Sequence, residues 1–118
     1  MKKRILLADD DGSVRRMVGR VLESEQYDVL LAKNGIEAAA IAAAAAPDLI
    51  VLDVSLAEQT NGSLFEIMHR PGVPLIVLTA RSRKSGPFAL PPAAAILEKP
   101  LDVFALLSVV ESLLAVRP

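Results

Sequence analysis

Five polar residues each stand at the end, or just past the end, of a short apolar run in this sequence. The runs read ILLADD, LIVLD, LIVLT and AAILEK, and the polar residues are Asp9, Asp10, Asp53, Thr79 and Lys99. If the runs are parallel strands of one sheet, their carboxyl ends meet at one edge and the five side chains converge there. Three carboxylates, a hydroxyl and an ammonium group suit the metal-assisted transfer of a phosphoryl group to a carboxylate.

Each residue type has a definable part in that chemistry. Neighbouring carboxylates are hard oxygen ligands that suit Mg²⁺, which binds few protein carboxylates and keeps several waters. Asp53 directly follows LIVL and could accept a phosphoryl group if a metal shields the incoming charge. Thr79 could then donate a hydrogen bond to one phosphoryl oxygen, and Lys99 could neutralise another as a point charge.

Simpler interpretations exist for each residue taken alone. Asp9, Asp10 and Asp11 could form a solvated acidic turn that caps the first helix, because aspartates favour helix N-termini. A threonine at a strand end is commonly structural, and a lone lysine is commonly solvated. All five residues at successive strand ends, in this order, favour one shared site.

The elements that must position these residues alternate between short β-like runs and helical patterns, which is typical of βα repeats around a parallel sheet. Apolar periodicity and capping signals predict strands at 4–8, 29–32, 49–52, 75–78 and 94–97, and helices at 14–25, 36–46, from 63 to before 71, and 101–116. A loop is expected directly after Asp53. Three prolines and a glycine between residues 81 and 92 predict a short or irregular helix there.

Size and composition limit the possible functions. A chain of 118 residues, of which 53% are hydrophobic, predicts one globular domain spanning 1–118. The net charge of −1 gives no general attraction for nucleic acid or anionic membranes, and the lack of cysteine excludes thiol chemistry. The start MKKRILLADDD is not a signal peptide and no apolar run is long enough to span a membrane, so we expect a cytoplasmic location.

Over nearly its whole length the chain resembles the receiver domain of two-component response regulators, including stand-alone chemotaxis receivers. The matching motifs are ILLADDDGSVRRMV, PDLIVLD, VPLIVLTA and EKP. The resemblance implies a flavodoxin-like α/β fold, a doubly wound five-stranded parallel sheet of order 2-1-3-4-5 with about five helices. It also implies a histidine kinase or phosphotransfer protein as phosphodonor, and no enzymatic activity beyond self-phosphorylation and autodephosphorylation.

The resemblance assigns roles to individual residues. Asp53 would be the phosphoacceptor, and Thr79 and Lys99 would contact the phosphoryl group. The Mg²⁺ ion would be bound directly by Asp10 and Asp53, mainly through water by Asp9, and by the backbone carbonyl of Ser55.

Several positions depart from the family's pattern. Leu56 and Ala57 stand where the family commonly has methionine and proline, which leaves the loop after the acceptor less restricted. Ile96 replaces the aromatic residue that usually couples the site to the output face, so we expect an atypical readout. We also hypothesise that Ser55 and Arg81 tune the lifetime of the phosphoryl group, with Arg81 slowing hydrolysis.

The final helix is unusually apolar. Its periodicity places Phe104, Leu107, Val110 and Leu114 toward the core, and a second apolar stripe widens the arc to about half the circumference. This stripe consists of Leu106, Val109, Leu113 and Val116. We therefore predict a homodimer or effector interface through the last helix and strand.

Two other functions remain open at this stage. The chain could be a receiver-like module whose partner binding does not depend on phosphorylation. It could also be a phosphatase similar to the haloacid dehalogenases, although that class needs a carboxylate two residues after the nucleophile, where this sequence has Ser55.

Overall fold

The computed structural model describes residues 2–58, 63–80 and 93–115, and its centre is a parallel sheet of five strands. The strands are β1 (Arg4–Ala8), β2 (Asp28–Ala32), β3 (Leu49–Asp53), β4 (Leu75–Ala80) and β5 (Ala95–Lys99). They lie in the order β2-β1-β3-β4-β5, which confirms the predicted flavodoxin-like topology. All five predicted strands are present, with ends that differ by at most two residues.

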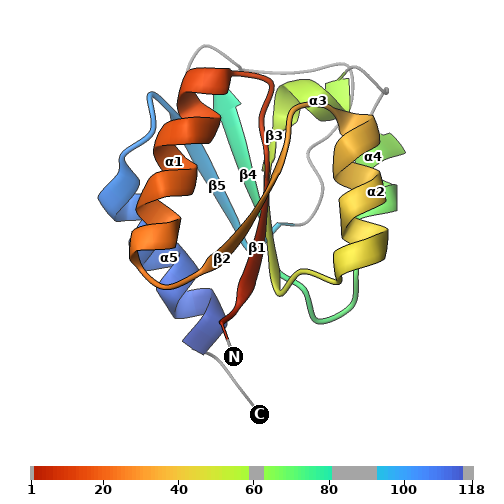
Figure 1. Cartoon of the computed structure of the whole chain (residues 1–118). Helices are drawn as coiled ribbons and strands as arrows, with labels where there is room; N and C mark the ends of the chain where they lie inside the picture. Colours follow the sequence, from red (N-terminus) through yellow and green to blue (C-terminus); the bar gives the residue numbers. More distant parts are fainter. Residues whose placement is uncertain (1, 59–62, 81–92, 116–118) are drawn as a thin grey trace.

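Helices cover both faces of this sheet (Figure 1). On one face lie α1 (Gly12–Ser24) and α5 (Val103–Ala115); on the other lie α2 (Gly35–Ala45), α3 (Val54–Glu58) and α4 (Ser63–Met68). Each face has its own cluster of buried apolar side chains. The central strand β3 is buried along its entire length, as expected for a strand covered on both sides.

Helix caps and strand register together place the polar residues at one edge of the sheet. Asp11 caps α1 by accepting hydrogen bonds from the Ser13 and Val14 backbone N–H groups. In the register of β1 with β3, Ala8 lies beside Leu52, so the next residue of each strand falls at the same level. These next residues are Asp9 and Asp53.

One short helix replaces the expected loop. Residues 54–58, directly after Asp53, form α3, with Val54, Leu56 and Ala57 buried. The expectation of a loop is therefore wrong, and the reason is local. Alanine is a good helix former with a backbone N–H to donate, whereas a proline at position 57 would lack that donor.

The predicted orientation of the last helix is also wrong in part. Phe104 is 79% exposed, and the residues that face the core are Leu106, Val110 and Leu114. The apolar arc is about half the circumference wide, so periodicity alone does not say which part of it is buried, and the stripe four residues apart is the one that packs on the sheet. Asp102 caps this helix, because its side chain accepts hydrogen bonds from the N–H groups of Phe104 and Ala105.

Other predictions fall outside the described residues, namely the irregular segment 81–92, the role of Arg81 and the packing of Val116. Ile96 is described, and it is 48% exposed on β5. Among the helices that the structure describes, none is long and apolar enough to cross a membrane.

Candidate functional site

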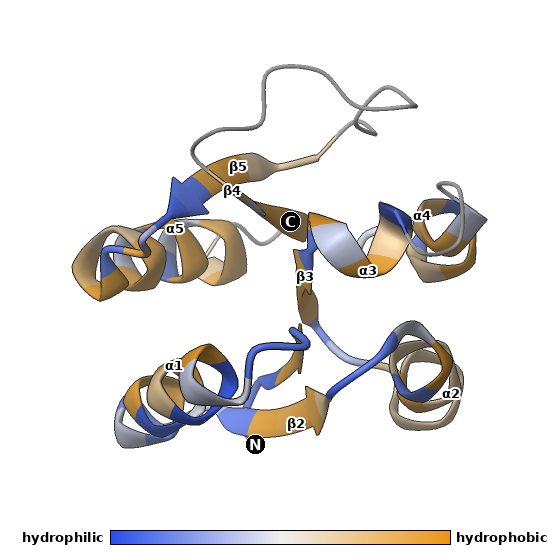
Figure 2. Ribbon diagram, turned by 90° about the horizontal axis from the view of Figure 1, so that it is seen from above, coloured by the Kyte–Doolittle hydropathy of each residue, from blue (hydrophilic) through white to orange (hydrophobic). Residues whose placement is uncertain are grey.

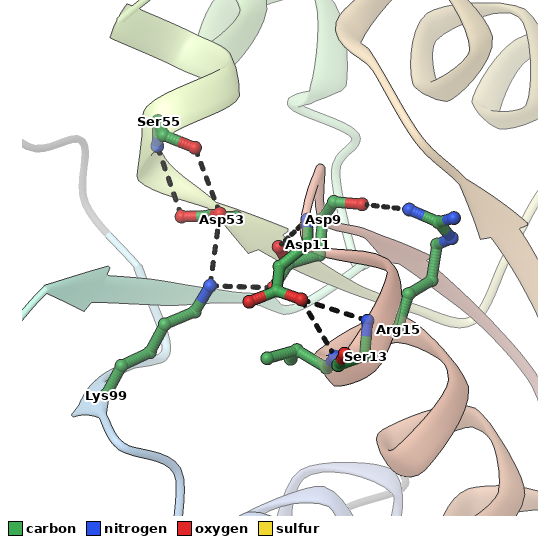
Figure 3. Close-up of polar contacts among 8 residues, drawn as sticks. Asp9, Asp11, Ser13, Arg15, Asp53, Ser55 and Lys99 are labelled. Carbon is green, nitrogen blue, oxygen red and sulfur yellow. Dashed lines mark hydrogen bonds and ion pairs between the residues drawn. The ribbon is translucent and has the colours of Figure 1, made fainter.

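The centre of the site is the carboxylate of Asp53, which is the last residue of β3. Asp53 is only 5% exposed. Ser55, in the first turn of α3, contacts both of its oxygens. The Ser55 backbone N–H donates to Oδ1 at 3.2 Å, and its hydroxyl donates to Oδ2 at 2.9 Å. The Lys99 ammonium donates to the same Oδ2 at 3.2 Å (Figure 3). Three donors from two elements therefore hold this carboxylate in one orientation.

Lys99 joins Asp53 to a second buried carboxylate, that of Asp9. Asp9 follows β1 and is completely buried, and its Oδ2 lies 2.9 Å from Lys99 Nζ. Its other oxygen accepts a hydrogen bond from the Asp11 backbone N–H at 2.9 Å. Apart from the ion pair, Asp9 Oδ2 accepts no hydrogen bond from the described part of the chain. One ammonium group thus balances two carboxylates at the sheet edge (Figure 3).

The two buried carboxyl groups titrate in opposite directions. Burial raises the pKa of Asp9 to about 6, although the Asp11 N–H and Lys99 oppose this shift. Burial also acts to raise the pKa of Asp53, but the Ser55 N–H, the Asp9 carboxyl and the Lys99 ammonium outweigh it and lower that pKa. For Lys99, burial acts to lower the pKa, but both carboxylates outweigh it and raise it. At neutral pH, the Asp53 carboxylate is therefore ionised and lies beside a positive charge.

Thr79 and Asp10 complete the predicted set in different ways. Thr79, in β4, is 7% exposed, and its buried Oγ1 has no hydrogen-bond partner within residues 2–58, 63–80 and 93–115. Such an unpaired hydroxyl costs free energy, which is typical of groups that await a ligand. Asp10 is exposed, unlike its neighbour Asp9.

The acidic residues fit a divalent cation. One carboxylate oxygen from each of Asp9, Asp10 and Asp53 lies within 4.8 Å of the other two. In an octahedral Mg²⁺ site, opposite ligands lie about 4.2 Å apart, since each bond is about 2.1 Å. The spacing of these oxygens is therefore close to that of ligands around one such ion. Of the predicted metal ligands, Ser55 contacts Asp53 directly, and the role of its carbonyl stays a prediction.

Sequence reasoning missed two contacts that support this site. Arg15 of α1 donates from Nη1 to the backbone carbonyl of Asp9 at 2.8 Å. Asp11 has two roles, because its backbone N–H holds Asp9 while its side chain caps α1. The expected acidic cap is thus confirmed for Asp11, whereas Asp9 belongs to the buried site. An arginine six residues after Asp9 was the only available sequence signal.

The fold and site define a receiver domain, and the sequence profile of the response regulator receiver domain matches residues 5–111. The chain belongs to this family, whose members act as signalling domains in two-component systems. Receiver domains bind Mg²⁺ through such acidic clusters and interact with histidine kinases or phosphotransfer proteins.

Individual relatives extend this assignment. The chain is 38% identical over 87 residues to the response regulator MprA of Mycobacterium bovis; the match covers 72% of this chain and 38% of MprA. The matched region thus spans 37–38% of the length of such curated relatives. Among solved structures, a response regulator receiver modulated diguanylate cyclase from Pelobacter carbinolicus is 30% identical in sequence and superposes with a TM-score of 0.74. This match covers 96% of the present chain and 92% of the other chain. A receiver protein from Burkholderia phymatum, 24% identical with 98% of both chains covered, shares the fold at a TM-score of 0.80.

Proposed function

We propose that this domain accepts a phosphoryl group on Asp53 in a Mg²⁺-dependent reaction and acts as a signalling switch or phosphorelay module. The observation that supports this most directly is the state of Asp53 itself. Its carboxylate is nearly buried, has a lowered pKa, and lies 3.2 Å from a lysine ammonium group. An ionised, oriented carboxylate beside a fixed positive charge is what an oxygen nucleophile requires.

The residues of the chain have distinct parts in the transfer. An Asp53 oxygen attacks phosphorus, the phosphorus–oxygen or phosphorus–nitrogen bond of the donor breaks, and the leaving group takes the electron pair. Lys99 neutralises charge on the phosphoryl oxygens, and the Thr79 hydroxyl gains a hydrogen-bond acceptor. Ser55 must release its hydroxyl contact with Asp53 Oδ2 if that oxygen is the nucleophile.

The acidic cluster would hold the cation. Asp10 and Asp53 would bind Mg²⁺ directly, Asp9 mainly through water, and Ser55 through its backbone carbonyl. When bound, Mg²⁺ supplies positive charge that shields the incoming phosphoryl group from the carboxylates. Arg15 keeps the Asp9 backbone in place during this exchange.

In this proposal residues 1–118 form one receiver domain in the cytoplasm, with a histidine kinase or phosphotransfer protein as donor. Its only catalysis is its own phosphorylation and dephosphorylation. An effector or a second copy would bind through α5 and β5, without direct contact to nucleic acid. The exposed side chains of Phe104 and Ile96 support such an interface.

The test is intact-mass spectrometry after incubation with acetyl phosphate. We expect a phosphoryl adduct on the wild type with Mg²⁺, no adduct with EDTA, and no adduct on Asp53→Asn. The matched control is Asp28→Asn, the same change at the exposed start of β2, which should keep the adduct. An unmodified wild type, despite bound Mg²⁺, would instead favour the phosphorylation-independent binding module. An adduct retained by Asp53→Asn would place the acceptor elsewhere.

A further inference from the structure

Away from the phosphorylation site, a groove of about 180 Å³ lies between α1 and the edge strand β2. Its apolar lining is Val29, Leu31 and Gly19, and its charged rim is Arg16, Arg20 and Glu23. The groove is smaller than typical small-molecule sites, which are about 300–1,000 Å³, so it suits a single side chain of a partner protein. Leu31 is 45% exposed there, which is unusual for a strand leucine beside a helix.

The same strand has a free hydrogen-bonding edge. The Asp28 backbone N–H donates to the Lys3 carbonyl, and the Ala32 carbonyl accepts from the Asp9 N–H. The first and last residues of β2 therefore direct their backbone groups toward the β1 segment of the chain. In a parallel ladder the intervening residues direct their N–H and C=O groups the other way. These residues are Val29 and Leu31, which also line the groove. Figure 2 shows β2 at the outer edge of the sheet, between α1 and α2, with no described element beyond it.

Charge identifies the kind of partner. Neither Arg16 nor Arg20 forms an ion pair or hydrogen bond with any residue that the structure describes, and both are exposed. The rim therefore has two unpaired guanidinium groups against one carboxylate. A second copy of the chain would bring a rim of the same net charge, whereas an acidic segment would complement it.

We propose that β2 and the groove bind an extended segment of a partner protein, which adds a strand to the sheet and inserts an aliphatic side chain flanked by carboxylates. Backbone groups of Val29 and Leu31 supply the hydrogen bonds, and the groove takes the side chain that lies on the α1 face. The flanking carboxylates pair with Arg16 and Arg20. This surface lies on the opposite side of the sheet order from β5, so it is separate from the α5–β5 interface.

The probe is a fluorescein-labelled peptide, Thr-Glu-Thr-Leu-Thr-Glu-Thr, and its matched control has lysine in place of glutamate. Fluorescence anisotropy with the 118-residue chain should detect binding of the acidic peptide alone, weakening as salt is added. Amide signals of Val29 and Leu31 should shift, and their hydrogen exchange should slow when the peptide is bound. Equal binding of both peptides, or of neither, overturns the proposal. A peptide-free dimer with protected β2 amides also overturns it, since a second copy would then occupy the edge.

Two variants separate binding from folding. Arg20→Glu should weaken peptide binding by about tenfold or more, because it reverses a rim charge. The matched control, Arg70→Glu, lies after α4 on the other face of the sheet and should bind normally. Gly19→Ala should raise the thermal midpoint, because alanine favours the helix and its β-carbon would lie 3.4 Å from Leu31 Cδ2, in ordinary contact.

Yet this same Gly19→Ala change should weaken peptide binding, because its methyl group fills part of the groove. Unchanged or tighter binding would overturn the proposal that the groove binds the aliphatic side chain of the peptide. These measurements use unphosphorylated protein and can be repeated with Asp53→Asn. A negative result therefore leaves the phosphoacceptor proposal untouched.

Discussion

The buried Asp9 carboxylate lowers the free energy of unfolding of the metal-free protein, and the substitution Asp9→Asn tests this effect. The side chain is completely buried, and burial raises its pKa from 3.8 to about 6. A raised carboxyl pKa means that the native state binds the proton more tightly, so stability falls as the pH rises from 3.8 to 6 and is constant above. Since one pKa unit is about 1.4 kcal/mol, ionisation of Asp9 costs about 3 kcal/mol at pH 8.

Asparagine resembles the neutral carboxyl group and keeps an oxygen for the Asp11 N–H. In EDTA, Asp9→Asn should therefore raise the free energy of unfolding by about 3 kcal/mol at pH 8 and by about 1 kcal/mol at pH 4.5. Urea denaturation followed by circular dichroism measures both values. The matched control is Asp10→Asn, the same change at the exposed neighbour, which should shift stability by less than about 0.5 kcal/mol.

Magnesium should cancel most of the stability difference between these two proteins at pH 8. A ligand that binds only the native state, present at 100 times its dissociation constant, stabilises it by about 2.7 kcal/mol. The wild type should gain this increment, and Asp9→Asn should lose most of it. The reasoning is refuted if Asp9→Asn is less stable than the wild type at pH 8 in EDTA, or if its increment is the same at both pH values.

Three further predictions concern the same sheet edge. Because Asp9 binds a proton with a pKa of about 6, Mg²⁺ affinity should fall as the pH drops from 7 to 5. Calorimetry in two buffers should detect the release of a proton on Mg²⁺ binding, and an affinity that does not change with pH would contradict this. Lys99→Met should destabilise the metal-free protein by about 3 kcal/mol at pH 8, since two buried carboxylates lose the ammonium group that pairs with them. Unchanged urea denaturation would show that these carboxylates are solvated. Thr79→Val should raise the free energy of unfolding by about 1 kcal/mol, because it removes a buried hydroxyl that has no partner in the described residues. The same change should slow formation of the phosphoryl adduct. A lower free energy of unfolding would mean that Oγ1 has a partner.

The sequence was sufficient to predict the sheet and the approach of its strand-end residues. Short apolar runs that end in polar residues specify buried parallel strands, and the strand order then brings Asp53 and Lys99 together. The sequence could not distinguish Asp9 from Asp10, because two identical neighbours differ only through the turn that buries one and exposes the other. The orientation of Phe104 was missed because α5 is apolar around a wide arc, and the pattern does not say which part of that arc packs on the sheet.

The distribution of buried polar groups gives an independent argument for a functional site. Among the described residues, the only polar or charged residues classed as buried are Asp9, Asp53 and Thr79. All three lie at one edge of the sheet, and Thr79 Oγ1 has no hydrogen-bond partner among the residues that the structure describes. Folding alone favours apolar side chains at such positions, since each unpaired buried group costs about 1–3 kcal/mol. Buried polar groups gathered at one point of an otherwise apolar interior therefore favour a ligand site, and the cation and phosphoryl group that we propose would fill it.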